Sequence, residues 1–346
     1  MIHSADAAIE VSALTKRYGS DFVALDRIDL AIARGTVTAI IGANGSGKST
    51  LVKILASILR ADGGSIRVLG ADPAVRSAAS RAGIGYIAQG VELDPEMTGA
   101  ETLRLFATLH GISSSRVQSR IDELAEAFGL REHLPRLVGS YSGGLRQRLH
   151  IALSFVHEPE LVFMDEPTAA LDPAGRAGVW QLVQRCRDLG RTLVVITHDT
   201  SEASRNCETI VLLHRGRVAA VGSPQELLAQ HASWTLHVQL ASPVVDESAL
   251  LGTIGLPMTS GTHVFRGNQL TVQFVETDAV AALWTKNAAI GRLEAAGETV
   301  LGFRFDPPDL LSAYFNLTGA GISEKFLPSL PPETDGKNHS AGANVH

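Results

Sequence analysis

The sequence predicts an α/β protein in two folded parts. Over residues 1–230, short apolar runs typical of buried strands alternate with amphipathic helical patterns. Over residues 231–319 the order of strand and helix patterns changes, so we expect a second, smaller domain there. Of the 346 residues, 45% are apolar and 19% are charged. This composition suffices for a sizeable core and excludes a chain that is disordered throughout.

Charge and the length of the apolar runs exclude two classes of protein. The region before residue 231 holds 24 of the 30 Lys and Arg and 25 of the 36 Asp and Glu, which leaves 6 and 11 after it. Neither part is basic, so we expect no nucleic-acid partner. The apolar runs fall far short of the roughly 18 residues of a membrane helix, and no secretory signal opens the chain. Cys186 and Cys207 lack metal-ligand spacing, and we expect two unpaired thiols in a cytoplasmic protein.

A glycine-rich loop between a strand and a helix is the main chemical motif. Residues 42–49 read Gly-x-x-x-x-Gly-Lys-Ser, between an apolar run at 37–41 and an amphipathic helix. Glycines allow backbone N–H groups to surround phosphate oxygens, and the helix N-terminus adds a partial positive charge. Lys48 is therefore expected to bridge the β- and γ-phosphates of a nucleotide, and the Ser49 hydroxyl to ligate Mg²⁺.

A second motif places two acids at the end of a buried strand. Residues 161–166 read Leu-Val-Phe-Met-Asp-Glu. Burying carboxylates is costly unless a cation compensates them, so Asp165 is expected to hold Mg²⁺ through water. Glu166 points elsewhere and is expected to polarise the attacking water. A proline-punctuated loop that carries Asp172 follows.

With the segment Tyr-Ser-Gly-Gly-Leu-Arg-Gln-Arg-Leu at 141–149, these motifs resemble the ATP-binding subunit of an ABC transporter over residues 9–230. The resemblance implies a P-loop NTPase fold with a helical subdomain at about 94–148, and ATP and Mg²⁺ as cofactors. It implies that nucleotide is held by the Walker A loop: Gly42, Asn44, Gly45, Ser46, Gly47, Lys48, Ser49 and Thr50.

The resemblance also implies roles outside that loop. Tyr18 matches the aromatic residue that stacks on adenine, and Gln89 the glutamine that touches Mg²⁺ and senses the membrane partner. Asp165 matches the Mg²⁺-binding aspartate, Glu166 the catalytic glutamate, and His198 the histidine that contacts the γ-phosphate.

Two further segments match the parts of the family that meet a second copy. Ser142, Gly143 and Gly144 match the signature that closes on the other subunit's ATP, and their position at a helix start suits an anion site. Asp172 matches the aspartate at the dimer seam. Leu145 and Ala88 depart from the commonest family residues, Gln and Pro, but neither replaces a chemical group, so an active ATPase is expected.

The region after residue 230 has the strand and helix order β-α-β-β-α-β, which is typical of a ferredoxin-like domain. Alternating residues of three of its strands predict one apolar face, made by Trp234, Leu236, Val238, Leu270, Val272, Phe274, Leu301, Phe303 and Phe305. Nothing in it suggests catalysis, so we expect a role in dimer contact or regulation. The segment 320–346 is rich in proline and small polar residues, and is expected to be mostly disordered.

Residues 307–319 resemble the terminal helix of the ABC-2 exporter branch, which includes drug, polysaccharide and lipid exporters. The likeness is carried by Asp309, Leu310, Tyr314, Leu317, Thr318 and Gly319. It implies an ATPase that pairs with a second copy of itself and powers export through transmembrane subunits on separate chains, at the cytoplasmic face of the cell membrane. Two alternatives remain. One is an importer ATPase, whose C-terminal domain would be expected to form a β-barrel, and the other is a soluble ABC ATPase that acts on ribosomes or DNA.

Overall fold

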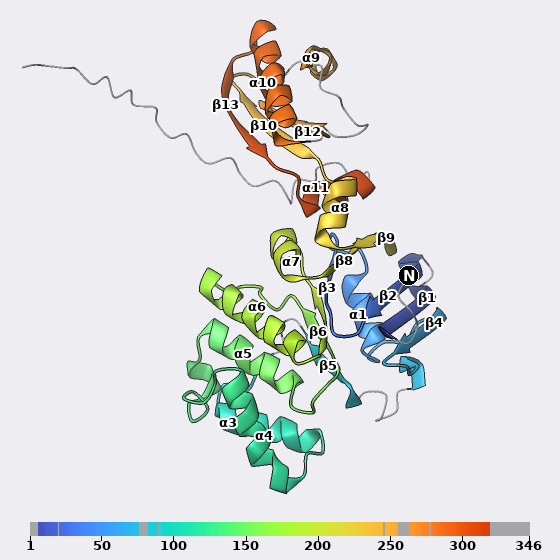
Figure 1. The fold of residues 1–346 in the computed structure, drawn as a ribbon, viewed down its shortest axis with the longest axis vertical. Coiled ribbons are helices and arrows are strands. Elements are labelled where there is room, and N and C mark those ends of the chain that lie inside the picture. The colour runs from blue at the N-terminus through green and yellow to red at the C-terminus, as the bar shows by residue number, and fades with distance from the viewer. Residues whose placement is uncertain are drawn as a thin grey trace, which may run out of the picture. The chain divides into compact units, whose positions relative to one another are not determined.

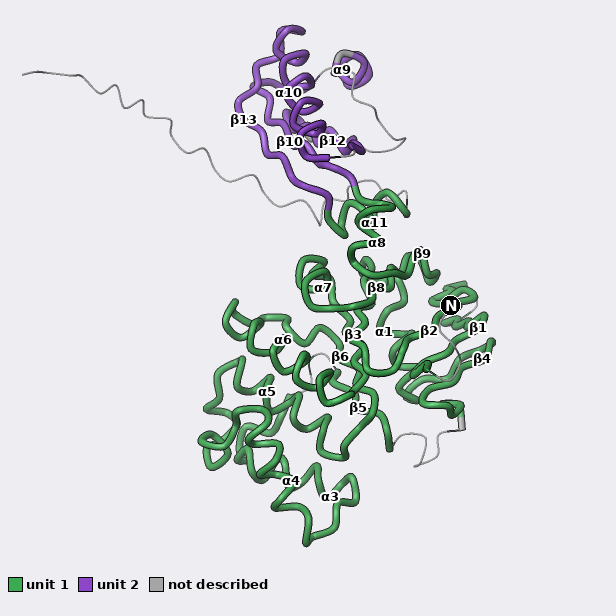
Figure 2. Tube along the Cα trace, in the orientation of Figure 1, with its two compact units in different colours: residues 1–232, 309–318 green, residues 233–308, 319–346 purple. Residues whose placement is uncertain are grey.

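The computed structural model describes residues 6–19, 21–75, 82–88, 90, 92–244, 246–254, 263–276 and 278–318. The chain divides into two compact units, and Figures 1 and 2 show the elements of each. Among the described residues, unit 1 comprises those up to 232 together with 309–318, and unit 2 comprises those between 233 and 308. None of the described helices is both long and apolar enough to span a membrane.

A six-stranded sheet in the order β5-β6-β7-β3-β8-β9 forms the centre of unit 1. All neighbours are parallel except β8 and β9. The three central strands β6, β7 and β3 are fully buried, as expected for apolar runs covered on both faces. The strands are Val37–Ile41 (β3), Ile84–Ile87 (β5), Leu161–Asp165 (β6), Thr192–Ile196 (β7), Thr209–His214 (β8) and Arg217–Gly222 (β9).

A second, antiparallel sheet in the order β2-β1-β4 belongs to the same unit. Its strands are Ala7–Tyr18 (β1), Phe22–Ala33 (β2) and Gly63–Val68 (β4). Helix α1 (Lys48–Leu55) lies between the two sheets in Figure 1, and its buried side chains share one core cluster with residues of both. This packing fixes the N-terminus of α1 against the end of β3.

Most of the remaining helices of unit 1 begin at a residue whose side chain caps them. Thr98 forms a capping box with Glu101 at the start of α3, and Ser142 and Asp172 cap α5 and α6. The predicted helical subdomain is present as α3, α4 and α5. The bounds are Gly99–Leu109 (α3), Ser114–Ala127 (α4), Gly143–Ser154 (α5), Pro173–Asp188 (α6), Thr200–Asn206 (α7) and Pro224–His231 (α8), with 3-10 turns at Pro73–Val75 and Val138–Ser140.

The structure divides the chain at a different place from the predicted one. The predicted second domain ran from 231 to 319, whereas helix α11 (Leu310–Thr318) groups with unit 1. The reason is packing: α11 lies against α8, α7 and β9, and it buries Leu310, Ala313 and Phe315. A pattern of apolar residues shows that a helix has a buried face, but not which domain covers it. The predicted disordered tail, 320–346, lies outside the described residues.

Unit 2 has the predicted ferredoxin-like topology. Its four strands form an antiparallel sheet in the order β11-β12-β10-β13, and both of its helices pack on one face. The split β-α-β arrangement of this fold is thereby confirmed. The elements are Trp234–Leu240 (β10), Glu247–Ile254 (α9), His263–Arg266 (β11), Gln269–Phe274 (β12), Ala279–Ala295 (α10) and Val300–Asp306 (β13).

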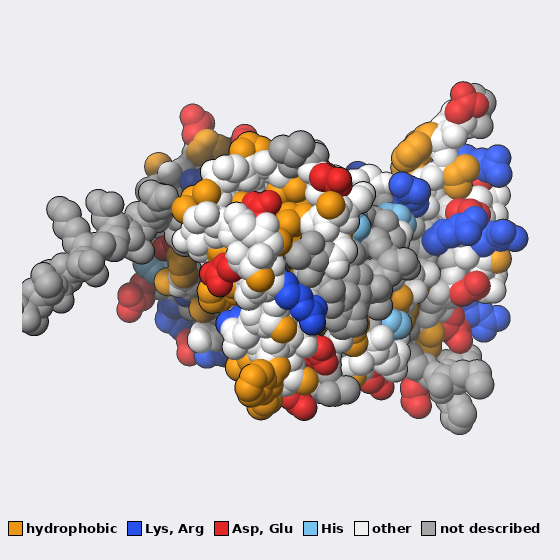
Figure 3. Space-filling model, turned by 90° about the horizontal axis from the view of Figure 1, so that it is seen from above, with side chains coloured by type: hydrophobic (Ala, Val, Ile, Leu, Met, Phe, Trp, Pro, Cys, Tyr) orange, Lys and Arg blue, Asp and Glu red, His pale blue; other side chains and the backbone are white. Residues whose placement is uncertain are grey.

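The predicted apolar face of unit 2 is correct in the central strands and wrong at one edge. Leu236 and Val238 of β10 and all three predicted residues of β12 are buried, but Leu301 and Phe303 of β13 are 56% and 49% exposed. Among the described strands, β13 pairs with β10 alone, and this pairing shifts register at Leu240. Figure 3 shows apolar side chains, in orange, interspersed with polar ones on the surface.

We expect Phe274→Ala to destabilise unit 2 by about 3–5 kcal/mol, because a fully buried aromatic ring is replaced by a cavity. The matched control is Trp284→Ala, which removes a ring that is 73% exposed and should change stability by less than about 0.5 kcal/mol. Hydrogen exchange of the amides in 233–308 measures this locally. Equal protection in the two variants would contradict the assigned core.

Candidate functional site

Three neighbouring strands bring most of the predicted site together at one edge of the six-stranded sheet. β6, β7 and β3 are adjacent and parallel, and Asp165, Ile196 and Ile40 lie at one level of the register. Because parallel strands end at the same edge, the segments that follow them meet there. These segments are the phosphate-binding loop, the paired acids and the turn that carries His198.

The phosphate-binding loop, residues 42–47, closes around its own lysine. The Lys48 Nζ donates to the carbonyl oxygens of Gly42 at 2.8 Å and Ala43 at 3.1 Å. The Ser46 N–H donates to the same Ala43 oxygen at 3.1 Å. Gly47, directly before α1, has φ of 105°, which side-chain-bearing residues rarely adopt. A buried ammonium beside the open N-terminus of a helix is a ready anion site.

Asp165 is a buried carboxylate in surroundings that suit a divalent cation. Burial raises its pKa, although a hydrogen bond with Ser49 and the charges of Lys48 and Lys53 lower it. Burial also lowers the pKa of Lys48, against the charges of Glu166 and Asp165. The hydroxyl and carboxylate oxygens of Ser49 and Asp165 are the ligands that Mg²⁺ prefers, so the donor set fits this ion.

Glu166 and His198 form a pair beside these groups. The His198 Nδ1 lies 2.9 Å from both carboxylate oxygens of Glu166. Glu166 has φ of 50°, and its N–H donates to the Ile196 carbonyl at 2.9 Å. This backbone turn directs its carboxylate toward His198, in the loop that follows β7. A left-handed conformation at a residue other than glycine is uncommon and often marks a functional site. His198 is largely exposed and free to reach a ligand.

Of two further predicted nucleotide contacts, Tyr18 and Gln89, the structure describes only Tyr18. Tyr18 ends β1 and is 45% exposed, with its ring stacked near Phe22 and within 5.8 Å of the Lys16 ammonium. An exposed aromatic ring offers a face on which a base can stack. Gln89 lies outside the described residues.

Ser142, Gly143, Gly144 and Asp172 lie together in a different place, a groove of about 730 Å³. Ser142 caps α5, whose first two residues are Gly143 and Gly144. Asp172 caps α6, where its Oδ1 accepts from the Gly175 N–H at 2.8 Å. Within the part of the chain that the structure describes, no hydrogen bond or ion pair joins this groove to the phosphate-binding loop. None of the described residues that line the groove belongs to the phosphate-binding loop, so the predicted contacts to ATP fall into two groups within the chain.

The groove also contains side chains that sequence reasoning missed. The cationic Arg136 and Arg148 line it beside the N-terminus of α5, together with His133. Arg148 stands in the arginine-rich segment after the signature, so a local signal was available, whereas Arg136 reaches the groove only through the fold. This lining suits an anion.

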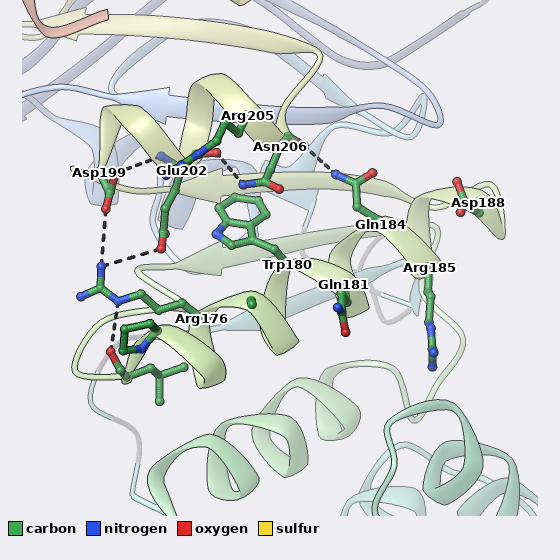
Figure 4. Close-up of a pocket in the computed structure, with 13 residues that line it drawn as sticks. Arg176, Trp180, Gln181, Gln184, Arg185, Asp188, Asp199, Glu202, Arg205 and Asn206 are labelled. Carbon is green, nitrogen blue, oxygen red and sulfur yellow. Dashed lines mark hydrogen bonds and ion pairs between the residues drawn. The ribbon is translucent and has the colours of Figure 1, made fainter. Parts of the chain in front are cut away.

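Arg176 is another residue that the sequence did not indicate. It lines a cavity of about 890 Å³ between α6 and α7, shown in Figure 4. Its side chain donates to the Leu171 carbonyl at 3.0 Å and forms ion pairs with Asp199 at 3.5 Å and Glu202 at 3.8 Å. The loop that carries Asp172 is thereby tied to the helix that follows His198.

We expect Gly42→Ala to lower ATP affinity roughly tenfold or more, because a Cβ there would overlap the Leu213 carbonyl and lie 2.5 Å from the Ser46 hydroxyl. The matched control is Gly63→Ala, whose Cβ would meet only Thr15, at 3.9 Å, and which should leave ATP affinity unchanged. Titration with a fluorescent ATP analogue measures both. Equal affinities would show that the loop is not held in this way.

Comparison with known proteins gives concordant results for sequence and structure. The ABC transporter family model matches residues 25–169. The daunorubicin resistance ATP-binding protein DrrA3 of Streptomyces coeruleorubidus is 39% identical over 91% of this chain and 97% of its own length. The Nod factor export ATP-binding protein I of Mesorhizobium japonicum is 34% identical over 65% of this chain and 66% of its own.

Solved structures agree over nearly two thirds of the chain. The cbiO1 structure from Clostridium perfringens is 29% identical, with a TM-score of 0.59 over 65% of this chain and 92% of its own. A dimeric ATP-binding cassette in a post-hydrolysis state, bound to ADP and Pi, is 27% identical, with a TM-score of 0.55 over 62% and 98%. The chain therefore belongs to the ABC transporter family, as one of its ATP-binding ATPase proteins.

Proposed function

We propose that this protein is the ATP-hydrolysing subunit of an exporter and that it acts through transmembrane subunits on separate chains. The observation that carries the proposal is the cluster of Lys48, Asp165, Glu166 and His198 at one sheet edge. The direction of transport is supported by relatives named for daunorubicin resistance and Nod factor export. These names also support a small organic molecule as the transported substrate.

ATP binding follows from the charges and donors of the loop. Lys48 lies buried against carbonyl oxygens and next to two acids, which supports a role for its ammonium in binding the β- and γ-phosphates. The N–H groups at the start of α1 add donors for the same oxygens. Tyr18 supplies the stacking face for adenine. Ser49 and Asp165, with Gln89, would hold Mg²⁺, which neutralises phosphate charge when bound.

Hydrolysis requires a base for the attacking water, and Glu166 fits that role. Its side chain is mostly buried, and His198 holds it on both oxygens. A carboxylate fixed in this way can accept a proton from water positioned beside the γ-phosphate. His198 remains exposed enough to contact the γ-phosphate itself.

We infer that the active unit is a pair of copies arranged head to tail. The signature groove, with its helix N-terminus and cationic lining, is separate from the phosphate-binding loop in the same chain. A second copy would place its Ser142, Gly143 and Gly144 over the first copy's ATP, and Asp172 at the seam. ATP then binds the closed pair more tightly than the open one, which is how a ligand drives a conformational change.

The exporter interpretation is supported over its two rivals. The importer interpretation carried the expectation of a C-terminal β-barrel, whereas unit 2 is ferredoxin-like. A factor that acts on ribosomes or DNA would be expected to have a basic region, and neither part of this chain is basic. The relatives are also transporter proteins. We place the protein at the cytoplasmic face of the membrane, where α3 and α4 would meet the membrane subunits.

The test of this function is Glu166→Gln, which keeps the shape of the side chain and removes the base. We expect ATP to bind as in the unchanged protein while turnover falls at least ~100-fold. The control is Glu160→Gln, which alters an exposed acid just before β6 that pairs with Arg34. It should leave turnover within about twofold. Near-normal turnover in Glu166→Gln, measured by phosphate release, would refute the assignment of the base.

A further inference from the structure

We propose that Tyr314 of the terminal helix α11 is a positioning residue for the phosphate-binding loop, so that nucleotide affinity depends on the docking of this helix. The proposal rests on the proposed function, because it concerns the same ATP site. It adds a control element to that site. Tyr314 lies 271 residues after the loop residue that it contacts.

The contact is made through the tyrosine hydroxyl. The Ala43 N–H donates to the Tyr314 Oη at 3.4 Å, and the Oη lies 2.9 Å from Nδ1 of His214, at the end of β8. The His214 and Tyr314 rings also pack edge to face, 5.8 Å between centroids. The hydroxyl therefore connects the first turn of the loop to the neighbouring strand.

The protonation states suit this chain of hydrogen bonds. Tyr314 is 4% exposed, and burial raises its pKa, against the bond from Ala43 and the charge of Arg215. Burial lowers the pKa of His214, helped by Arg215. A protonated hydroxyl can donate to the unprotonated Nδ1 of His214 and still accept from Ala43.

Ala43 is the residue through which this contact reaches the lysine. Its carbonyl oxygen accepts from the Ser46 N–H and the Lys48 Nζ, both at 3.1 Å. Tyr314 therefore holds the N–H of Ala43, while the carbonyl of the same residue positions the ammonium of Lys48. The hydroxyl binds at the beginning of the loop, so it leaves the donors at the start of α1 free.

The helix that carries Tyr314 is firmly docked on unit 1. Asp309 caps it by accepting from the Ser312 N–H at 2.7 Å. The Asn316 side chain donates to the His231 carbonyl at 2.8 Å, which ties α11 to α8. Leu310 and Phe315 are buried with Tyr314.

Helix α11 is the first element of unit 1 that follows unit 2 in the chain. The chain enters unit 2 from the end of α8 and comes back through residues 307–309 into α11. Only three residues separate the last strand of unit 2 from the helix that touches the phosphate-binding loop. A change that displaces α11 would thus release Ala43 and weaken nucleotide binding.

The test is Tyr314→Phe in the full-length protein, which keeps the ring and removes only the hydroxyl. We expect the dissociation constant for a fluorescent ATP analogue to rise about twofold to fivefold, as for the loss of one hydrogen bond. The turnover number at saturating ATP should change less than twofold. Without nucleotide, the amides of residues 42–47 should exchange hydrogen faster.

The matched control is Asn316→Ala, which removes one hydrogen bond from the same helix but leaves the hydroxyl in place. The buried Leu310, Tyr314 and Phe315 still keep α11 docked on unit 1 in this variant. Its ATP affinity and loop exchange should therefore stay close to those of the unchanged protein. Unchanged affinity and exchange in Tyr314→Phe, or equal weakening in both variants, would overturn the role of the hydroxyl. Failure of the unchanged protein to bind ATP would instead refute the proposed function.

Discussion

The burial of one ammonium group opposite two carboxylates is the constraint on which the site depends. Lys48 is 8% exposed, and its charge is offset by Asp165, Glu166 and the loop carbonyls. Burying any of these charges alone would be costly, so they must be brought together accurately. The parallel order β6-β7-β3 does this, because it ends all three strands at one edge. Helix α1, packed between two sheets, fixes the lysine at that edge.

The sequence motifs predicted the parts of the site whose residues lie close together along the chain. The loop at 42–49 lies between its strand and its helix as expected, and the acids at 165 and 166 end a buried strand. The order of strands in unit 2 also followed from its pattern, because each alternating segment has one buried face. Leu301 was assigned to the core wrongly, since its exposure depends on an edge position and a register shift that the pattern does not contain.

Contacts between distant segments were not predictable from the sequence. Tyr314 stood in a helix recognised by its likeness to exporters, yet nothing local indicated that its hydroxyl meets Ala43. Arg176 likewise meets acids more than 20 residues away. These residues share one property: each joins a loop of the ATP site to a helix outside it. Through these residues, a movement of a helix outside the site can therefore change the geometry of the site.

The central claim is that each ATP site is built from two copies, and mixing two inactive variants tests it most directly. Lys48→Ala disables the loop. Ser142→Asp retains a good helix cap and puts a negative charge where phosphate is proposed to bind. Each variant alone should fail to hydrolyse ATP, and their mixture should regain activity, because a mixed pair contains one intact loop facing one intact signature. A mixture that stays inactive although mixed pairs form would contradict the account.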